Sequence, residues 1–205
     1  MENELEKLCK ELEHFVTEEW AVRAILEKEI LTTNVFDPCS GSGVMAKVAK
    51  DFGYNVATND IEDWGFPTIY KQDFLSFDGK PFANGEDFTV FMNPPFSKAE
   101  KFVDKAFQLG ARKVICFQRF SWYEGSYDTG KRRGQWWEHN RPARIWICGD
   151  RVSCWRFDLP TDKDGDKTDH DGKKLSQAST SHAWFVWERG HLPSAITGHV
   201  FKTRG

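Results

Sequence analysis

The chain has 205 residues and a formal net charge of −3, from 28 Lys and Arg against 31 Asp and Glu. This length predicts one domain with a substantial core. No apolar run approaches the roughly 18 residues of a membrane span, so we expect no association with a membrane. The negative total excludes a uniformly basic nucleic-acid coat protein, although it allows one local basic face. Five cysteines without a C-x-x-C pair, together with a charged N-terminus, favour a reduced, cytoplasmic protein.

The hydrophobic pattern changes along the chain from helical to alternating. Apolar residues at helical spacing predict a helix over residues 3–30, interrupted at Thr17, whose hydroxyl and following acids are typical of a helix N-terminus. Further on we expect strands at 35–36, 55–58, 68–70, 88–92, 114–117, 143–148 and 183–187, and helices at 44–52, 98–109 and 135–139. Unbroken apolar strands that alternate with helices predict an α/β fold with a mostly parallel sheet covered on both faces.

Three of the predicted strands end in turns that are rich in functional groups. Ligands of parallel sheets bind beyond the carboxyl ends of the strands, so these turns predict a binding site at that edge of the sheet. The turns are Asp37-Pro38-Cys39-Ser40-Gly41-Ser42-Gly43, Asn59-Asp60 and Asn93-Pro94-Pro95-Phe96.

The glycine turn favours a nucleoside cofactor that carries a positive charge. Gly41 and Gly43 open a helix directly after a strand, where backbone N–H groups can approach a ligand closely. Asp60, at the end of the next strand, can accept hydrogen bonds from ribose hydroxyls. The third glycine of the dinucleotide fingerprint is replaced by Ala46, and Asp37 would repel a pyrophosphate but attract an ammonium. The pattern therefore favours S-adenosylmethionine over NAD, although the glycines alone also fit a plain strand–helix turn.

The Asn-Pro-Pro-Phe turn suits chemistry on an amine. Two successive prolines lack N–H donors and fix the backbone, so the turn is rigid and presents acceptors outward. The side-chain oxygen of Asn93 and the carbonyl of Pro94 could hold the two hydrogens of an exocyclic NH₂ group. That arrangement would let the nitrogen pyramidalise toward a methyl donor. Phe96 offers a face on which a planar base can stack. The alternative for these four residues alone is a Pro-terminated strand with a buried Phe.

Together these motifs resemble the class I S-adenosylmethionine-dependent methyltransferases, most closely the small phage-type DNA N6-adenine methyltransferases. The resemblance covers roughly residues 15–120. It implies a Rossmann-like sheet that ends in one antiparallel strand. It implies a catalytic motif of Asn93, Pro94, Pro95 and Phe96. The cofactor contacts that it implies are Phe15, Thr17, Trp20, Asp37, Pro38, Cys39, Ser40, Gly41, Gly43, Asp60, Ile61, Asp73, Phe74 and Asn93.

A local excess of positive charge points to DNA as the partner. Residues 111–156 hold ten basic residues against four acidic ones, interleaved with seven Trp and Tyr. This mixture suits phosphate contacts and base stacking, and the target base would be single-stranded or flipped out of a duplex. The alternative is that the tryptophans are core and the basic residues are solvated. The expected substrate contacts are Phe96, Arg119, Trp122, Tyr123, Lys131, Arg132 and Arg133.

The chain is too short for a separate recognition domain of the usual size. We therefore interpret residues 1–205 as one methyltransferase domain, with candidate recognition segments at 121–142 and 158–181. The Asp-rich part of the second segment does not fit a calcium loop, because Lys167 and Lys173 stand where Gly and Glu are needed. We read it as a flexible loop, and no His or Cys spacing predicts a metal site.

The expected function is methyl transfer from S-adenosylmethionine to the N6 amine of adenine in DNA, in a host cytoplasm if the protein is phage-encoded. Three other acceptor amines fit the same motif: cytosine N4, guanine N2 in RNA, and a protein glutamine. A different alternative is a catalytically silent phage protein that occupies DNA sites.

Overall fold

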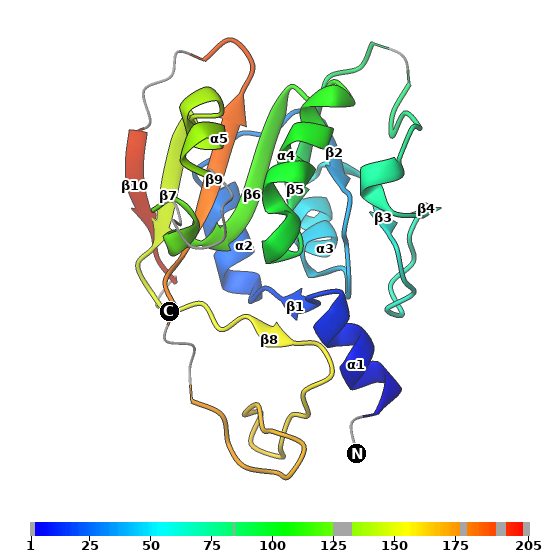
Figure 1. Ribbon diagram of the computed structural model, residues 1–205, viewed down its shortest axis with the longest axis vertical. Helices are drawn as coiled ribbons and strands as arrows, with labels where there is room; N and C mark the ends of the chain where they lie inside the picture. Colours follow the sequence, from blue (N-terminus) through cyan, green and yellow to red (C-terminus); the bar gives the residue numbers. More distant parts are fainter. Residues whose placement is uncertain (1–2, 84, 125–132, 177–179, 192–195, 203–205) are drawn as a thin grey trace.

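The computed structural model describes residues 3–83, 85–124, 133–176, 180–191 and 196–202. Its centre is an eight-stranded sheet in the order β10-β7-β9-β6-β5-β2-β3-β4 (Figure 1). All neighbouring pairs in this sheet are parallel except those that β9 makes with β6 and β7. The predicted α/β class with a mostly parallel sheet is confirmed.

Six strands of the sheet coincide with apolar runs of the sequence, whereas β4 overlaps the strand expected at 68–70 only at Tyr70 and β10 matches no expected strand. In β5 and β3 nearly every residue is buried, because helices cover both faces. The eight strands are β2 (Asn34–Asp37), β3 (Asn55–Asp60), β4 (Tyr70–Lys71), β5 (Phe88–Met92), β6 (Lys113–Arg119), β7 (Arg144–Cys148), β9 (His182–Glu188) and β10 (Ile196–Val200). Two further short strands, β1 (Phe15–Val16) and β8 (Trp155–Arg156), form a separate antiparallel pair.

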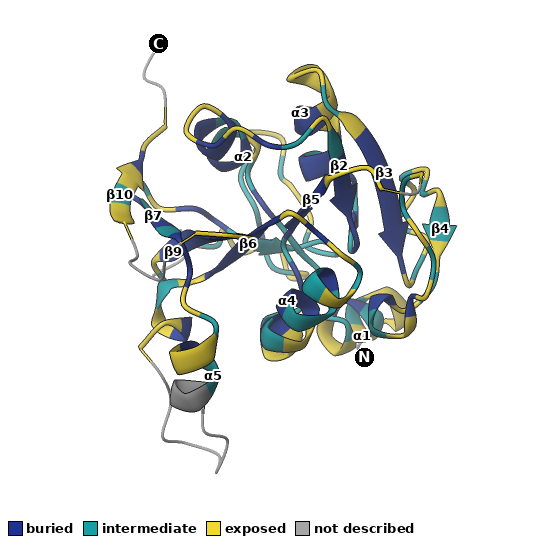
Figure 2. Cartoon of the chain, turned by 90° about the horizontal axis from the view of Figure 1, so that it is seen from above, coloured by how far each residue is buried: buried dark blue, intermediate teal, exposed yellow. Residues whose placement is uncertain are grey.

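Helices cover both faces of the sheet. Figure 2 shows α2 (Glu19–Leu26) and α3 (Val44–Asp51) against one face, with α4 (Ala99–Gln108) and α5 (Arg133–His139) against the other. Each face has its own apolar core. Single turns of 3₁₀ helix follow three loops: η1 (Phe74–Ser76), η2 (Phe96–Lys98) and η3 (Phe120–Trp122). None of the helices in the described residues has the length and apolar character that a membrane crossing requires.

The N-terminal region differs from the helical pattern that the sequence predicts, which is interrupted only at Thr17. Helix α1 (Glu4–Glu11) ends before β1, and α2 begins only at Glu19. Thr17 does not cap α2, whose N-cap is Glu18 without a side-chain hydrogen bond. The Thr17 hydroxyl instead accepts a hydrogen bond from the side chain of Asn93. A tertiary contact has therefore replaced the local cap.

The C-terminal region also departs from expectation. The antiparallel strand that the resemblance implies is present as β9, but the sheet continues with β10, which pairs parallel with β7. The sequence did not predict β10, because most of its residues are exposed and it shows no apolar pattern. Within the predicted flexible loop, the structure has two isolated antiparallel bridges, Thr161 to Lys167 and Thr168 to Lys174.

The topology of the sheet brings the three turns that are rich in functional groups to its carboxyl edge. β2 pairs parallel with both β3 and β5, so Asp37 and Asp60, at the ends of their strands, and Asn93, just after β5, lie at the same edge of the sheet. α1, β1 and β8 lie across this edge (Figure 1).

Candidate active site

The three turns contact one another directly. Ser40 donates its N–H to the carbonyl of Asn59 at 3.0 Å, which joins the glycine turn to the end of β3. The Cys39 thiol lies 3.5 Å from the carbonyl of Asn93 and joins it to the end of β5. A pocket opens between them. Thirteen of the predicted residues line it: Phe15, Thr17, Asp37, Pro38, Cys39, Ser40, Gly41, Asp60, Ile61, Asp73, Phe74, Asn93 and Pro95.

Glycine is required at both positions of the turn. Gly41 and Gly43 have φ of +51° and +80°, which residues with a Cβ rarely adopt. A Cβ at Gly41 would stand 2.6 Å from Nε2 of His14, and one at Gly43 would stand 2.2 Å from the ring of Phe66. Gly41 therefore leaves room at the pocket wall, whereas Gly43 is covered by Phe66 and is not a lining residue.

Asp60 organises one wall of the pocket. Its carboxylate accepts hydrogen bonds from the N–H of Gly41 at 2.8 Å and from the indole of Trp64 at 3.0 Å, and it also accepts one from Glu62 N–H. Burial raises the pKa of this carboxyl. A carboxylate has about four acceptor positions, so Asp60 retains capacity for a ligand hydroxyl.

Asp37 is a buried acid at the floor of the pocket. It is 2% exposed, and it has no ion-pair partner among the residues that the structure describes. Burial, together with the charge of Asp60, raises the pKa of Asp37 to about 8. A ligand ammonium placed beside this carboxyl would lower the pKa again, because an opposite charge favours the ionised form. The site is therefore suited to a cationic ligand.

The side-chain amide of Asn93 is fixed by hydrogen bonds from its nitrogen, whereas its oxygen has no protein partner among the described residues. Nδ2 donates to the carbonyl of Phe15 at 3.1 Å and to the hydroxyl of Thr17 at 2.8 Å. Oδ1 is buried and has no hydrogen-bond partner among the described residues. A buried acceptor without a partner is costly, so its presence in a pocket wall indicates a ligand donor.

Phe96 lies in an aromatic group beside the pocket and is not one of its lining residues. Its ring stacks on Phe15 with centroids 5.4 Å apart. The guanidinium carbon of Arg119 is 4.8 Å from the centre of the same ring, and the ring of His182 lies 6.3 Å away. The predicted contacts Phe96 and Arg119 are thus brought together at the end of β6.

Several predicted residues lie elsewhere. Trp20 lies in α2, donates a hydrogen bond to Glu18, packs against the apolar core and is not a lining residue of the pocket. Pro94 is also not a lining residue. Trp122 is 4% exposed and packs on Trp137 and Phe185, so it belongs to the core and cannot serve as a substrate contact. A sequence in which aromatic and basic residues alternate does not show which of the aromatic side chains are buried.

The remaining predicted substrate contacts lie around this core. Tyr123 is 38% exposed and packs edge-on against Trp137. Lys131 and Arg132 lie outside the described residues, and Arg133 begins α5 without a described side chain.

The pocket also has lining residues that the sequence analysis missed. His14 stands between the rings of Trp64 and Phe157, with centroids 4.1 and 4.8 Å away, and burial lowers its pKa to about 4. Such residues carry no local signal, because only the tertiary fold brings them to the glycine turn. The missed lining residues are Leu12, Glu13, His14, Val16, Ser42, Val44, Met45, Trp64, Lys98 and Phe102.

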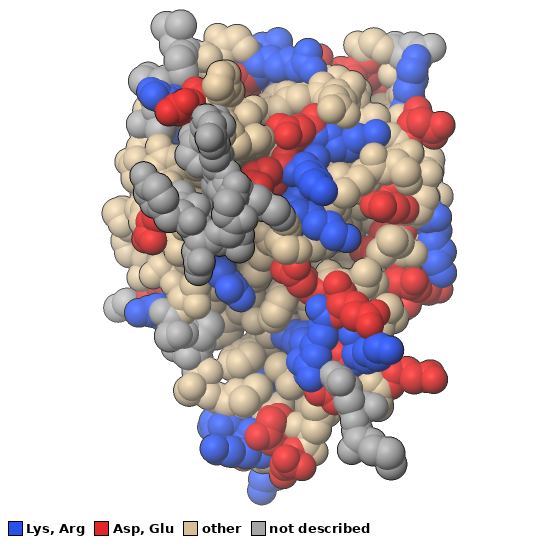
Figure 3. Space-filling model, in the orientation of Figure 1, with Lys and Arg blue, Asp and Glu red and all other residues tan. Residues whose placement is uncertain are grey.

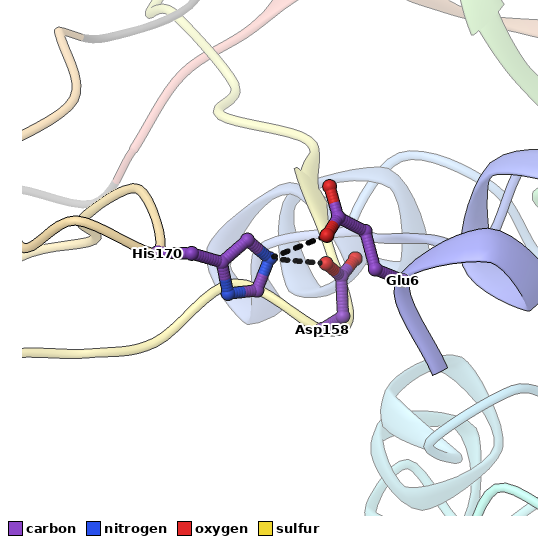
Figure 4. Close-up of side chains that lie close together, drawn as sticks. All are labelled: Glu6, Asp158 and His170. Atoms are coloured by element: carbon purple, nitrogen blue, oxygen red, sulfur yellow. Dashed lines mark hydrogen bonds and ion pairs between the residues drawn. The ribbon is translucent and has the colours of Figure 1, made fainter. Parts of the chain in front are cut away.

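One group of potential metal ligands lies outside this pocket. Among the described residues, ligand atoms of Glu6, Asp158 and His170 lie within 4.8 Å of one another (Figure 4). Arg156 already provides a positive charge there, since its guanidinium pairs with Asp158 at 2.5 Å and with Glu6 at 3.4 Å. We therefore describe these four residues as an ion-pair cluster that joins α1 to the segment after β8.

Neither a protein-family model nor a curated protein matches this sequence. Solved structures do match. Atu636 from Agrobacterium tumefaciens, a predicted O-methyltransferase, has a TM-score of 0.53 and 11% identity, covering 90% of this chain and 86% of that one. PH1948 from Pyrococcus horikoshii, a proposed RNA methyltransferase, has a TM-score of 0.50 and 15% identity, covering 92% and 98%. The chain has the Rossmann-like fold of the class I methyltransferases. Protein 1320 of Thermoplasma acidophilum is similar at 16% identity, with a TM-score of 0.50 and 84% of each chain covered.

Proposed function

We propose that this protein transfers a methyl group from S-adenosylmethionine to the exocyclic N6 amine of adenine in DNA. The observation that carries the proposal is the Asn93 side chain. Its Nδ2 is tied to Phe15 and Thr17, while its buried Oδ1 has no partner among the described residues. An acceptor held in this way at the wall of the pocket suits a planar NH₂ group, which can donate to it.

The pocket residues fit the proposed cofactor. Asp37 supplies a buried carboxyl for the cofactor ammonium, and Asp60 has acceptor capacity for the ribose. Ile61, Asp73 and Phe74 also line the pocket, and Asp73 lies in the segment whose Asp contacts the cofactor adenine in the family that the sequence resembles. Gly41 keeps this wall open, because a side chain there would collide with His14. Bound S-adenosylmethionine would supply a methyl group attached to a positively charged sulfur.

The protein's contribution to the reaction is positioning. The hydrogen bond from the target amine to Asn93 Oδ1 would orient the nitrogen lone pair and help the nitrogen to pyramidalise. As the new N–C bond forms, the methyl–sulfur bond breaks and its electrons remain on sulfur. The methylated nitrogen then loses a proton to solvent, so no general base is needed at the site. Phe96, with Arg119 beside it, offers a face for the target base.

The acceptor is tested by supplying S-adenosylmethionine with a labelled methyl group and three substrates separately: random-sequence DNA, total RNA and denatured protein. We expect label in DNA and none in the other two. Asn93→Ala should abolish the transfer while retaining cofactor binding in calorimetry. Label only in RNA or protein would contradict the DNA assignment. Binding of the cofactor without transfer to any of the three would contradict the methyltransferase assignment.

A further inference from the structure

Helix α4 carries its charges in two separate rows. At 3.6 residues per turn, positions 101 and 105 lie about 40° apart on one flank of the helix, and positions 100 and 104 lie about 40° apart on the other. The buried row Ala99, Phe102, Val103 and Ala106 packs against the sheet between the two flanks. Lys98 is the N-cap residue and directly precedes the helix. The three lysines Lys98, Lys101 and Lys105 are here called the α4 lysine row.

The acids of α4 point away from the lysine row. Glu100 accepts a hydrogen bond from the indole of Trp122 at 3.2 Å, and Asp104 accepts from the indole of Trp136 at 3.0 Å. Both acids thus face the aromatic core beside α5. No ion pair joins any lysine of the row to another described residue, although 13 pairs among the described residues involve other Lys, Arg or His. Within the part of the chain that the structure describes, the positive charge of this flank is therefore not neutralised.

The row begins at the candidate active site. Lys98 lines the pocket, and it follows the Asn-Pro-Pro-Phe turn by two residues. Lys101 is exposed one turn further along the helix, and Lys105 is half-buried one turn beyond that. Figure 3 shows basic side chains gathered over α4 on this face of the molecule. The helical rise places Lys98 and Lys105 roughly 10 Å apart along the axis.

Within the basic stretch 111–156, fewer side chains are available to bind phosphate than its net charge indicates. Arg144 is bound to Glu29 and Glu188, and Arg156 is bound to Asp158 and Glu6. These guanidinium groups are therefore neutralised inside the protein. The α4 lysine row has no such pairing among the described residues, which makes it the stronger candidate for contacts with phosphate.

We propose that the α4 lysine row binds the phosphodiester backbone of the nucleic acid whose base enters the pocket. This inference rests on the proposed function, since it places the strand that carries the target amine. Lysine acts as a point charge toward phosphate, so the row would add affinity without reading sequence. The strand would leave the pocket at Lys98 and continue along α4 past Lys101 and Lys105.

The test uses the double variant Lys101→Gln/Lys105→Gln, which leaves the pocket residue Lys98 unchanged. Binding is measured by fluorescence anisotropy with single-stranded DNA, duplex DNA and RNA of one length, at several salt concentrations. The slope of log Kd against log salt should fall by about 1.4 for single strands or about 1.8 for a duplex. Kd should rise at moderate salt for the strand type that the wild type methylates, while calorimetry should find the cofactor affinity unchanged.

The matched control is Lys28→Gln/Lys202→Gln, which removes the same charge from exposed positions outside α4. This variant should keep the wild-type slope. A double α4 variant that binds as tightly as the wild type, or a control that weakens binding equally, would overturn the inference but leave the proposed function standing. A wild type that binds the cofactor but none of the three nucleic acids would overturn both.

Discussion

At the scale of single residues, the decisive atom is the unpartnered Oδ1 of Asn93. Asn93→Ala removes it, and the loss of one hydrogen bond aimed at the reacting group typically lowers kcat by about 100-fold or more. We expect this loss in the transfer rate, with the cofactor Kd within a few-fold of the wild type. Asn34→Ala, at the amino end of β2, is the control and should retain transfer. Turnover by the Asn93 variant near the wild-type rate would remove the catalytic assignment.

A second residue-scale prediction concerns pH. The pKa of Asp37 is raised from 3.8 to about 8, so the free protein carries a proton on this carboxyl at pH 7. The cofactor ammonium needs the carboxylate, so binding should release that proton and should tighten as pH rises from about 6 to 8. Calorimetry in two buffers of different ionisation enthalpy measures the release. Affinity and heat that do not change with pH or buffer would contradict this role.

The variant Asp37→Asn tests the same raised pKa through the thermal stability of the protein. A carboxyl whose pKa is higher in the folded than in the unfolded protein contributes stability below about pH 4, and this contribution is lost as pH rises toward about 8. We therefore expect Asp37→Asn to raise the Tm of the cofactor-free protein at pH 8 more than at pH 5, and to weaken cofactor binding at both. An equal change of Tm at the two pH values would contradict the raised pKa.

At the scale of elements, residues 12–17 form a strap between α1 and α2 that lies against both the glycine turn and the Asn-Pro-Pro-Phe turn. Glu13 has a φ of +52°, a conformation that costs a non-glycine residue about 1 kcal/mol or more. Its carboxylate accepts from the N–H of Ser97 at 3.2 Å and also contacts the Ser97 hydroxyl. This contact holds the strap in the position from which Phe15 and Thr17 bind Asn93.

Glu13→Ala should therefore release the strap without unfolding the protein. We expect KM for the cofactor to rise several-fold while Tm changes little, because the contact with Ser97 lies at the surface. Glu11→Ala, on the exposed side of α1, should behave as the wild type. Steady-state kinetics on the two variants decide the matter, and an unchanged KM in Glu13→Ala would show that the strap does not depend on this contact.

The same elements show what the sequence could and could not predict. The burial of β5 and the turn at Asn93 follow from local patterns, since an apolar run and a Pro-Pro pair have few structural alternatives. The two-residue strand β1 is too short to show a period. The sequence did not predict the α4 lysine row, because Glu100 and Asp104 alternate with the lysines along the chain. Only the structure shows that these two acids accept hydrogen bonds from indoles and face away from the lysines.

At the scale of the whole molecule, the carboxyl edge of the sheet is covered from two parts of the chain. α1 and the strap come from the N-terminal region, and β8 with the segment after it comes from residues 155–170 (Figure 1). The ion-pair cluster of Glu6, Arg156, Asp158 and His170 fastens these parts together (Figure 4). The net charge of −3 thus conceals internal pairing of several basic residues and a basic flank on α4 that forms no ion pair with any described residue.

The central claim is that the pocket, with Asn93 at its wall, methylates adenine N6 in DNA. The most direct measurement is mass spectrometry of the nucleosides released from random-sequence DNA after incubation with the protein and S-adenosylmethionine. We predict N6-methyl-2′-deoxyadenosine with the wild type and none with Asn93→Ala. Methylated cytosine in its place, or unmodified nucleosides from a protein that binds the cofactor, would contradict the claim.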